Sequence, residues 1–338
     1  MDVRVIGAGA VGGYIAARLA LAGHGVSVVA RGAQLAAIRS GGLRLLGSDG
    51  REEVAPVLAI DEAVAQPPAD LVVLAVKAHQ VAAVAPLVAR LLAPQTVVVA
   101  LQNGLPWWYF DGHGGALDGV RLASLDPDGA IAAHIPTRCV LGCVTWGSFD
   151  VPAPGSVRTG VRPGARFTIG EPDGTSSERL RDVVEAWTRA GLATAATADI
   201  RRDKWLKAWG NLAFNSIGAL CHATVADAHD YAPSRALAAA MMTEAEAVAA
   251  SVGVRFPMGV EERLATAATL GAARSSTQQD VEAGRALEVD ALLGAVVEIA
   301  RHTGVATPHL DAMTAALRLL DRIITRDRVR IAPQPLDR

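Results

Sequence analysis

VRVIGAGAVGGYIAARLALAGHGVSVVAR, residues 3–31, is the stretch that decides the fold. A short apolar run leads into a glycine-rich turn and an amphipathic stretch of helical character, and after a Gly-His-Gly break a second apolar run ends at Arg31. This order predicts a strand, a helix and a second strand parallel to the first. We therefore expect a βαβ unit of an open parallel sheet.

The turn of this unit carries the pattern GxGxxG. Its members are Gly7, Ala8, Gly9, Ala10, Val11 and Gly12, and they lie where the first strand gives way to the helix. Gly7 permits the tight turn, Gly9 lets a pyrophosphate approach the backbone, and Gly12 allows the helix to pack closely. The helix N-terminus faces the phosphate charge. The motif predicts a dinucleotide site, and a glycine turn without a ligand is the alternative.

The residues after the glycines indicate which dinucleotide is bound. NAD-binding versions of the unit carry an acid about 20 residues further on, where it hydrogen-bonds the ribose. Between Asp2 and Asp49 the chain has no acidic residue, and Arg31 stands at the end of the second strand. Because a guanidinium binds a phosphate through several donors, the pattern favours NADPH over NADH. A solvated surface arginine is the alternative interpretation of Arg31.

The composition of the chain excludes several classes of protein. With 338 residues, 51% of them hydrophobic and 20% charged, the chain is too apolar to be disordered. A formal net charge of -2 gives no reason to expect nucleic acid or an anionic membrane as a partner. Three cysteines without ligand-like spacing are typical of free thiols in a reducing cytosol, and they predict no metal site. No apolar run is long enough to span a bilayer, so we expect a cytoplasmic protein.

Further strand and helix signals divide the chain into two parts. Strands are predicted at 71–76, 96–101 and 139–145 and within 164–174, with helical patterns between several of them. A mainly parallel, doubly wound sheet of the Rossmann type is therefore expected in residues 1–198. Helices are predicted at 203–220, 234–252, 258–271, 277–303 with a break allowed at Gly284, and 308–325. The expected fold class is α/β, with an all-α domain in residues 199–338.

A long glycine-rich segment, 105–136, follows the predicted strand at 96–101. Because structureless segments of this length are uncommon in compact domains unless they have a function, we expect an excursion near the binding pocket. Its aromatic residues Trp107, Trp108, Tyr109 and Phe110 either form a wall for the substrate or pack against their own domain. Packing is the favoured interpretation.

Polar residues stand at the ends of two predicted strands. Lys77 ends one and Asn103 ends the next, which places both at the carboxyl edge of the sheet, where open α/β sheets bind ligands. The chain has only three lysines, Lys77, Lys204 and Lys207, and three asparagines, Asn103, Asn211 and Asn215. Their rarity in an alanine- and arginine-rich chain favours a functional role. Chance clustering and, for Asn103-Gly104, an ordinary turn are the alternatives.

The segment KWLKAWGNLAFN, residues 204–215, combines an apolar helix with a polar stripe. At about 100° per residue, positions four apart drift by only about 40°, so Lys207, Asn211 and Asn215 share one narrow face. A lysine held on an apolar helix loses solvation, which lowers its pKa and makes it a better proton donor. Lys204 is roughly 60° from this face, and we interpret it as a surface or hinge residue. A polar seam between packed helices is the alternative for the stripe.

Residues 275–300, SSTQQDVEAGRALEVDALLGAVVEIA, form a second helical segment that carries polar residues. Ser276 and Gln279 have the spacing of a capping box, which predicts a helix start. Glu288 opens an apolar helical run. It acts there as the acid at a helix N-terminus, or it faces Lys207 and sets the charge of that lysine. The residues alone leave both alternatives open.

The whole arrangement resembles the ketopantoate reductase family over nearly the full chain. The residues that carry the resemblance are Gly7, Gly9, Gly12, Arg31, Lys77, Asn103, Lys207, Asn211, Asn215, Ser276, Gln279, Asp280 and Glu288. The resemblance implies hydride transfer from NADPH to the C2 ketone of a 2-oxo acid. In the family this substrate is 2-dehydropantoate, and the product is (R)-pantoate for pantothenate biosynthesis.

The resemblance also implies a role for each site residue. Lys207 would be the general acid, and Glu288 would contact the cofactor ribose and the substrate hydroxyl. Asn103 would bridge cofactor and substrate. The remaining implied contacts are Asn211, Asn215 and Ser276 with the substrate, and Lys77 and Ser148 with NADPH.

Two features depart from the family pattern. Members that reduce ketopantoate usually carry a further polar residue shortly after the second helix asparagine, whereas this chain has Val225, with His222 and Thr224 nearby. The excursion at 105–136 is also longer than expected for the family. The alternatives are therefore a related reductase of another 2-oxo or 2-hydroxy acid, or an NADPH-binding sensor without catalysis. Pairing of the helical domains into a homodimer is one expected assembly.

Overall fold

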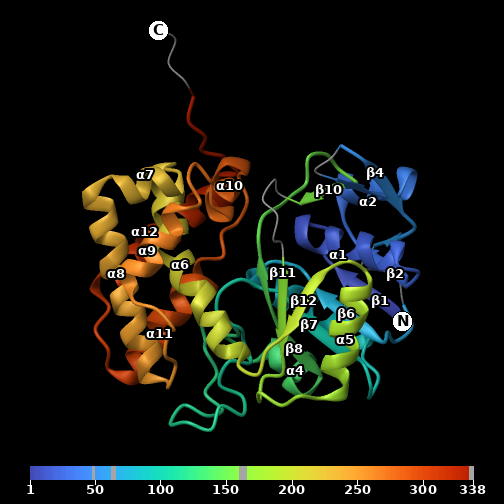
Figure 1. Cartoon of the computed structure of the whole chain (residues 1–338), viewed down its shortest axis with the longest axis horizontal. Coiled ribbons are helices and arrows are strands. Elements are labelled where there is room, and N and C mark those ends of the chain that lie inside the picture. Colours follow the sequence, from blue (N-terminus) through green and yellow to red (C-terminus); the bar gives the residue numbers. More distant parts are fainter. Residues whose placement is uncertain (48–49, 62–65, 160–165, 335–338) are drawn as a thin grey trace.

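The chain folds into two lobes that lie side by side, one containing the sheets and the other consisting of helices (Figure 1). The computed structural model describes residues 1–47, 50–61, 66–159 and 166–334. The last described residues leave the helical lobe and extend away from it (Figure 1). Among the helices of these described ranges, none combines the length and the apolar character needed to cross a membrane.

An eight-stranded sheet forms the centre of the first lobe. Its strands in spatial order are β12 (Ala193–Ala196), β11 (Arg166–Gly170), β8 (Val140–Trp146), β7 (Val97–Ala100), β6 (Leu71–Leu74), β1 (Asp2–Ile6), β2 (Gly25–Val29) and β5 (Leu58–Ile60). From β8 to β5 all neighbours are parallel, whereas β11 is antiparallel to β8. Ile6 of β1 lies opposite Val29 on one side and Leu74 on the other.

Helices cover both faces of this sheet, which confirms the doubly wound arrangement. α1 (Ala10–Leu21) and α5 (Glu178–Arg189) pack on one face, where Val73 of β6 is buried. α3 (Val81–Arg90) packs on the other face, where Leu74 is buried. Because alternate residues of a strand point to opposite faces, an almost wholly apolar strand supplies both cores. The remaining helical elements of this lobe are α2 (Gly32–Gly41), α4 (Ala130–His134) and the 3₁₀ turns η1 (Ala78–Gln80) and η2 (Thr137–Cys139).

A second sheet of four short strands, which the sequence did not predict, lies over α1. Its order is β4 (Glu52–Ala55), β3 (Leu43–Leu46), β10 (Ser156–Thr159) and β9 (Phe149–Asp150). Leu43, Leu45 and Val157 enter the same core as α1. Its strands have two to four residues, and β3 pairs with β10, more than 100 residues further on, so no local pattern reveals them. In the predicted strand within 164–174, Gly164 and Ala165 lie outside the described residues, and β11 begins at Arg166.

The second lobe consists of helices, and those that the sequence predicted after residue 199 are present with shifted ends. Its helices are α6 (Ile200–Cys221), α7 (Val225–Asp230), α8 (Ala232–Ser251), α9 (Val260–Ala268), α10 (Ser276–Ala283), α11 (Ala295–Thr303) and α12 (Pro308–Asp327). The expected break falls at Gly284, which ends α10 in the left-handed conformation. A π-helical turn, η3 (Asp290–Gly294), then leads into α11. The short helix α7 was not predicted.

α6 is the central helix of the helical lobe, and it also reaches the sheet lobe (Figure 1). Its start is fixed by Asp199, whose side chain accepts a hydrogen bond from the Arg202 amide at 3.0 Å. Trp205 and Trp209 are fully buried in the core of the lobe. The Trp209 indole donates to the Met242 carbonyl at 2.7 Å and stacks on Phe256 with ring centroids 4.2 Å apart. These contacts fix the rotation of α6 and therefore the direction of its polar side chains.

The excursion at 105–136 packs its aromatic side chains into both lobes. Trp107 and Trp108 belong to a core of the sheet lobe, whereas Tyr109 and Phe110 belong to the core of the helical lobe. The Tyr109 hydroxyl accepts a hydrogen bond from the Trp205 indole at 2.6 Å. All four aromatic residues are less than 10% exposed, so they pack rather than form an open wall. The sequence predicted packing against their own domain, and the packing in fact extends to both lobes.

The backbone of the two lobes meets closely at Gly104. The amide of Leu105 donates to the Ala291 carbonyl in η3 at 2.9 Å. Gly104 has φ +75°, and a Cβ placed on it would lie 2.0 Å from the same carbonyl oxygen. Glycine is therefore required here for two reasons, the left-handed backbone and the absence of a side chain.

Replacing Gly104 by alanine should destabilise the protein more than the same change at Gly23. Gly23 has φ +88° but open space around its missing Cβ, so Gly23→Ala measures backbone strain alone, about 1 kcal/mol. Gly104→Ala adds a collision with the Ala291 carbonyl, and we expect a total loss of about 2–4 kcal/mol. Urea denaturation of both variants measures the difference. Equal losses would show that the close approach of the lobes does not require glycine.

Candidate active site

The glycine loop has the shape of a phosphate cradle. Gly7 adopts φ +107°, and Gly9 is the N-cap of α1. A Cβ at Gly9 would meet no atom within 4 Å, whereas one at Gly12 would lie 2.1 Å from the Gly7 carbonyl oxygen. The first turn of α1, all of it described, has no acidic residue, so the helix dipole faces open space without a competing negative charge. These features fit the pyrophosphate of a dinucleotide, and Ala8, Ala10 and Val11 form the rest of the loop.

Arg31 lies two residues after β2 and is the exposed N-cap of α2. Gln34 on the same helix bridges the cradle to the second sheet, since its Nε2 donates to the Ala8 carbonyl and its Oε1 accepts from the Gly155 amide, both at 2.7 Å. Sequence reasoning missed Gln34, and no local pattern predicts a contact with Gly155, 121 residues away. Ser148, predicted on resemblance alone, lies exposed between β8 and β9.

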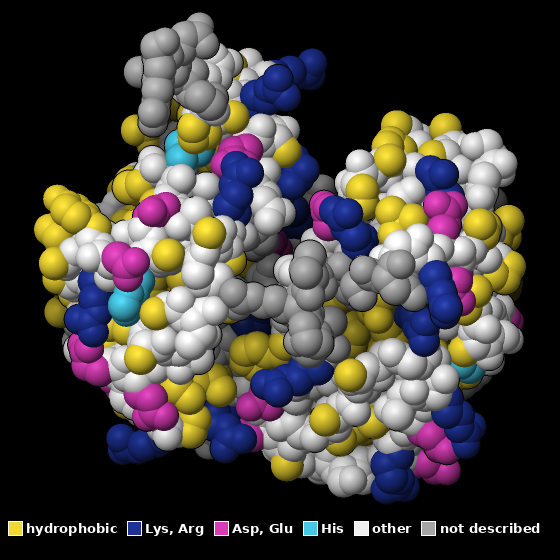
Figure 2. Space-filling view, turned by 45° about the horizontal axis from the view of Figure 1, so that its top comes forward, with side chains coloured by type: hydrophobic (Ala, Val, Ile, Leu, Met, Phe, Trp, Pro, Cys, Tyr) yellow, Lys and Arg dark blue, Asp and Glu magenta, His cyan; other side chains and the backbone are white. Residues whose placement is uncertain are grey.

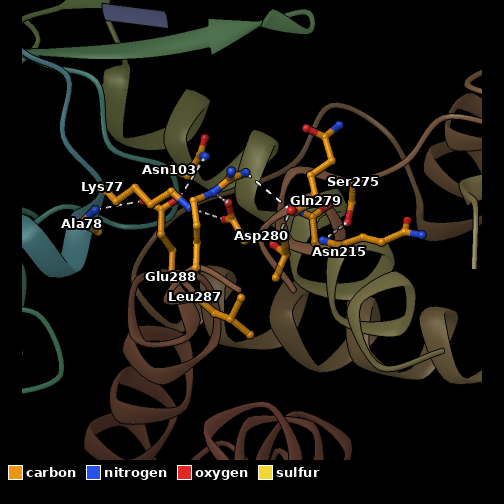
Figure 3. A network of polar contacts seen from close by, with 12 residues as sticks. Lys77, Ala78, Asn103, Asn215, Ser275, Gln279, Asp280, Leu287 and Glu288 are labelled. Carbon is orange, nitrogen blue, oxygen red and sulfur yellow. Dashed lines mark hydrogen bonds and ion pairs between the residues drawn. The ribbon is translucent and has the colours of Figure 1, made fainter. Parts of the chain in front are cut away.

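Glu288 of the helical lobe receives hydrogen bonds from the ends of two strands of the sheet lobe (Figure 3). Its Oε1 accepts from the Ala78 amide at 2.9 Å, and its Oε2 accepts from Asn103 Nδ2 at 3.4 Å. Lys77 forms an ion pair with Asp280, and Arg285 Nε donates to the same carboxylate at 2.9 Å. Lys77, Asn103 and Glu288 therefore meet where the lobes face each other.

The polar stripe of α6 contacts both lobes. Lys207 Nζ donates to the carbonyl of Thr145, in β8, at 2.5 Å. Asn215 Nδ2 donates to Thr277 Oγ1 on α10 at 3.4 Å, and Asn211 lies between them on the helix, partly buried. The Asn215 contact is a polar seam between packed helices, whereas Lys207 reaches the sheet edge. The polar-seam interpretation therefore fits Asn215, and the role of Lys207 as a proton donor stays a prediction.

The interpretation of Lys204 as a surface or hinge residue is wrong. Lys204 is only 3% exposed, and its Nζ donates to the Gln102 carbonyl at 2.7 Å. Because α6 packs against the sheet edge as well as its own lobe, a position roughly 60° from the stripe is also enclosed. The sequence held one signal for this role, the scarcity of lysine. All three lysines of the chain hydrogen-bond to the opposite lobe.

Burial changes the acidity of both lysines of α6. Loss of solvation lowers the pKa of Lys207 to about 8 and that of Lys204 to about 7. The negative charge of Glu288 opposes this shift in both cases. Burial also raises the pKa of the neighbouring Cys143 thiol to about 12, so the thiol stays neutral. Lys207 therefore holds a proton near pH 7 and releases it more readily than an ordinary lysine.

The helix start near Ser276 differs by one residue from the predicted capping box. The side chain of Ser275 caps α10 and accepts from the Gln278 amide at 3.1 Å, whereas Ser276 is the exposed first residue of the helix. Gln279 Nε2 donates to the Arg274 carbonyl at 3.4 Å instead of closing the box. Two adjacent serines give the same pattern, so spacing alone cannot choose between them.

His222, Thr224 and Val225 lie where members of the family usually carry a further polar residue, and each has contacts within the helical lobe. Thr224 caps α7 in a reciprocal pair with Asp227, and Val225 is buried at 6% exposure. His222 ends α6 in the left-handed conformation, with Nδ1 3.7 Å from Glu282. Capping accounts for Thr224 and burial for Val225, whereas the buried Nδ1 atom of His222 has no hydrogen-bond partner among the described residues.

Two further features of the described residues bear on the site. Basic side chains lie on both sides of the hollow between the lobes (Figure 2). A separate groove of about 730 Å³ lies between the excursion and the helical lobe, lined by residues that include Tyr109, His113, Arg201, Arg255 and His302. None of the predicted site residues lines it. Within the described ranges, no group of three or more His, Cys, Asp or Glu residues is arranged to hold a metal ion.

A dinucleotide-binding sheet lobe joined to a helical lobe with a buried lysine defines the class of two-domain nicotinamide-dependent oxidoreductases. The family model described as ketopantoate reductase PanE/ApbA matches residues 3–174, and its C-terminal counterpart matches residues 199–321. The chain therefore belongs to the ketopantoate reductase family, which confirms the resemblance seen in the sequence.

Relatives of known name or structure match nearly the whole chain. The 2-dehydropantoate 2-reductase of Mesorhizobium japonicum is 46% identical over 321 residues, covering 95% of this chain and 98% of the relative. That of Halobacterium salinarum is 32% identical and covers 95% and 99%. A crystal structure from Ralstonia solanacearum MolK2, of a protein assigned to the ketopantoate reductases, is 42% identical with a TM-score of 0.90 and covers 96% and 98%. These comparisons agree with the predicted fold class.

The lowered pKa values of Lys204 and Lys207 should make the protein more stable as the pH rises from about 7 to 9. Lysines of the unfolded chain have pKa values near 10.4, so in this interval the unfolded state binds more protons than the folded state. The free energy of unfolding then increases with pH, by on the order of 1 kcal/mol per unit. Urea denaturation at pH 7, 8 and 9 measures this slope.

The double variant Lys204→Met/Lys207→Met is the matched control, because it removes both titrating groups and keeps their apolar stems. Its slope should be much flatter. From about pH 8 upward the raised pKa of Cys143 acts in the opposite direction in both proteins, so the prediction concerns the difference between the two slopes. An unchanged slope in the variant would contradict the lowered pKa values.

Proposed function

We propose that this protein catalyses the NADPH-dependent reduction of 2-dehydropantoate to (R)-pantoate. One observation carries the proposal: the partly buried Lys207, which donates to the Thr145 carbonyl and has a lowered pKa, lies at the carboxyl edge of a sheet that also presents a phosphate cradle. The names of full-length relatives at up to 46% identity support the substrate. In the balanced reaction, the 2-oxo acid, NADPH and one proton give the 2-hydroxy acid and NADP⁺.

The residues of the sheet lobe fit the cofactor. The loop from Gly7 to Gly12 would hold the pyrophosphate, and Arg31 would hold the 2′-phosphate. Lys77 and Asn103 would reach the cofactor from the ends of β6 and β7, with Ser148 as a further contact. When bound, NADPH supplies the hydride that adds to the C2 carbonyl carbon.

Lys207 is the proton donor in this proposal. Its ammonium polarises the carbonyl oxygen and protonates the oxygen as negative charge develops there. A pKa of about 8 leaves most of the ammonium protonated at neutral pH and still makes it a stronger acid than a solvated lysine. Glu288 would accept a hydrogen bond from the product hydroxyl and from the ribose. The remaining substrate contacts are Asn103, Asn211, Asn215 and Ser276.

A related reductase of another 2-oxo acid is the second candidate. It is favoured by the buried Val225, which cannot hydrogen-bond a substrate hydroxyl, and by Thr224 and His222, which make local contacts. A homodimer through the helical lobe and a cytoplasmic location remain predictions from the sequence. The lowered pKa of Lys207 argues against an NADPH sensor without catalysis, because binding alone does not need a proton donor with a shifted pKa.

The test is the loss of NADPH absorbance with purified protein and 2-dehydropantoate, beside a panel of other 2-oxo acids. We expect rapid oxidation with 2-dehydropantoate, and a loss of kcat by about 10²–10⁴ in Lys207→Ala because the proton donor is gone. NADPH binding, followed by its fluorescence, should persist in that variant. Turnover with another acid alone would favour the second candidate, and unchanged turnover of Lys207→Ala would reject the assigned role.

Arg31→Ala should weaken NADPH selectively. Loss of a charge-assisted hydrogen bond to the 2′-phosphate is expected to raise the Kd for NADPH by about 10- to 100-fold. NADH lacks this phosphate and serves as the internal control, so its Kd should change little. Titration of nucleotide fluorescence measures both constants. If the Kd values for NADPH and NADH rise by the same factor, Arg31 does not bind the 2′-phosphate.

A further inference from the structure

Lys204 has no role in the proposed reaction so far, because it belongs neither to the glycine motif nor to the polar stripe of α6. It is 3% exposed, although lysine is among the residue types that are least often fully buried. Its Nζ donates to the main-chain oxygen of Gln102 at 2.7 Å. The next residue along the chain is Asn103, which donates to Glu288. A buried lysine of the helical lobe is thus attached directly beside a candidate site residue of the sheet lobe.

Gln102 connects this contact to the neighbouring strand. It is 6% exposed, and its Nε2 donates to the carbonyls of Leu74 at 2.9 Å and Val76 at 3.0 Å. Val76 directly precedes Lys77, the residue that pairs with Asp280. Gln102 therefore joins the ends of β6 and β7, and Lys204 joins both of them to α6.

Lys204 and Lys207 attach α6 to two adjacent strand ends. Lys204 reaches the carbonyl that follows β7, and Lys207 reaches the carbonyl of Thr145 in β8. Two hydrogen bonds one turn apart on a helix restrict both its sliding and its rotation against the sheet. A methionine would fill the Lys204 position without the desolvation cost of a buried amine, so packing alone does not explain the lysine.

We propose that Lys204 is a positioning residue, which through Gln102 holds Asn103 in register with Lys207. This inference rests on the proposed function, because it concerns the geometry of the same reaction. The contact fixes residues 102–104 against α6. The distance between the Asn103 amide, which would bind cofactor and substrate, and the Lys207 ammonium, which would donate the proton, therefore stays constant. Misplacement of reacting groups by about 1 Å lowers a rate by about 100-fold.

The proposed role of Lys204 does not depend on its charge. Burial and the charge of Lys207 lower the pKa of Lys204 to about 7. Lys204 remains a hydrogen-bond donor to Gln102 in either protonation state. Other groups that act on both lysines are Cys143 and Glu288.

The variant Lys204→Met tests the proposal, because it keeps the apolar stem and removes the donor. Arg202→Met is the matched control, since it removes a cation from the same turn of α6 where the side chain is 47% exposed. In the ligand-free proteins, amide hydrogen exchange in the peptide 101–106 should be about tenfold faster in Lys204→Met and unchanged in Arg202→Met. This measurement does not depend on activity.

Kinetics provide the second readout. We expect kcat/KM of Lys204→Met to fall by about 100-fold while kcat still declines as the pH rises through about 8, since Lys207 is intact. Lys204→Gln, which keeps a shorter donor, should recover part of the loss, and it replaces the methionine variant if that one does not fold. Wild-type protein that turns over no 2-oxo acid would reject the proposed function and leave the exchange test valid.

Three outcomes would overturn the positioning role. Unchanged exchange in the peptide 101–106 would show that Lys204 does not hold the turn. A lower melting temperature with wild-type kinetics would assign Lys204 to stability alone. Loss of the decline in kcat near pH 8 in Lys204→Met, with the decline retained in Lys207→Ala, would make Lys204 itself the proton donor.

Discussion

The contact of α6 with the carboxyl edge of the sheet is the constraint on which the rest of the site depends. A parallel sheet directs all its strand ends to one edge, but the ends alone supply only backbone and a few side chains. The helical lobe adds an amine there by placing the partly buried Lys207 against the Thr145 carbonyl. Trp205 and Trp209, fully buried in the core of the helical lobe, fix the rotation of the helix that carries this amine.

Carboxylates of the helical lobe complete the junction. Glu288 accepts from Ala78 and Asn103, and Asp280 pairs with Lys77. Each of these contacts joins a strand end to a helix or turn of the other lobe, so the site exists only while the lobes are together. The π-helical turn η3 begins two residues after Glu288 and presents the Ala291 carbonyl to the excursion. Such wide turns are frequent at functional sites, and here it lets two backbones touch at Gly104.

The sequence predicted those parts of the molecule that a local pattern encodes. The βαβ unit, the central strands and the stripe on α6 follow from hydrophobic periodicity and glycine spacing. The second sheet, the bridge made by Gln34 and the burial of Lys204 depend on contacts between residues far apart in the chain. Helical periodicity predicted Lys204 at the surface because it considers one helix alone. In the structure α6 packs against its own lobe on one side and against the sheet lobe on another, so Lys204 is buried. The cap of α10 was misplaced by one residue because Ser275 and Ser276 are chemically identical.

The scarcity of lysine has a consequence for covalent labelling. Apart from the α-amino group, the only primary amines of the chain are Lys77, Lys204 and Lys207, and each of them contacts the opposite lobe. A reagent that acylates amines therefore finds its side-chain targets only at the junction of the lobes. The lowered pKa values of Lys204 and Lys207 also give them more of the nucleophilic, uncharged form at mild pH than a surface lysine has. Apart from the α-amino group, acylation of amines therefore reports on the junction of the lobes, and Lys204, which is 3% exposed, reacts only when this junction opens.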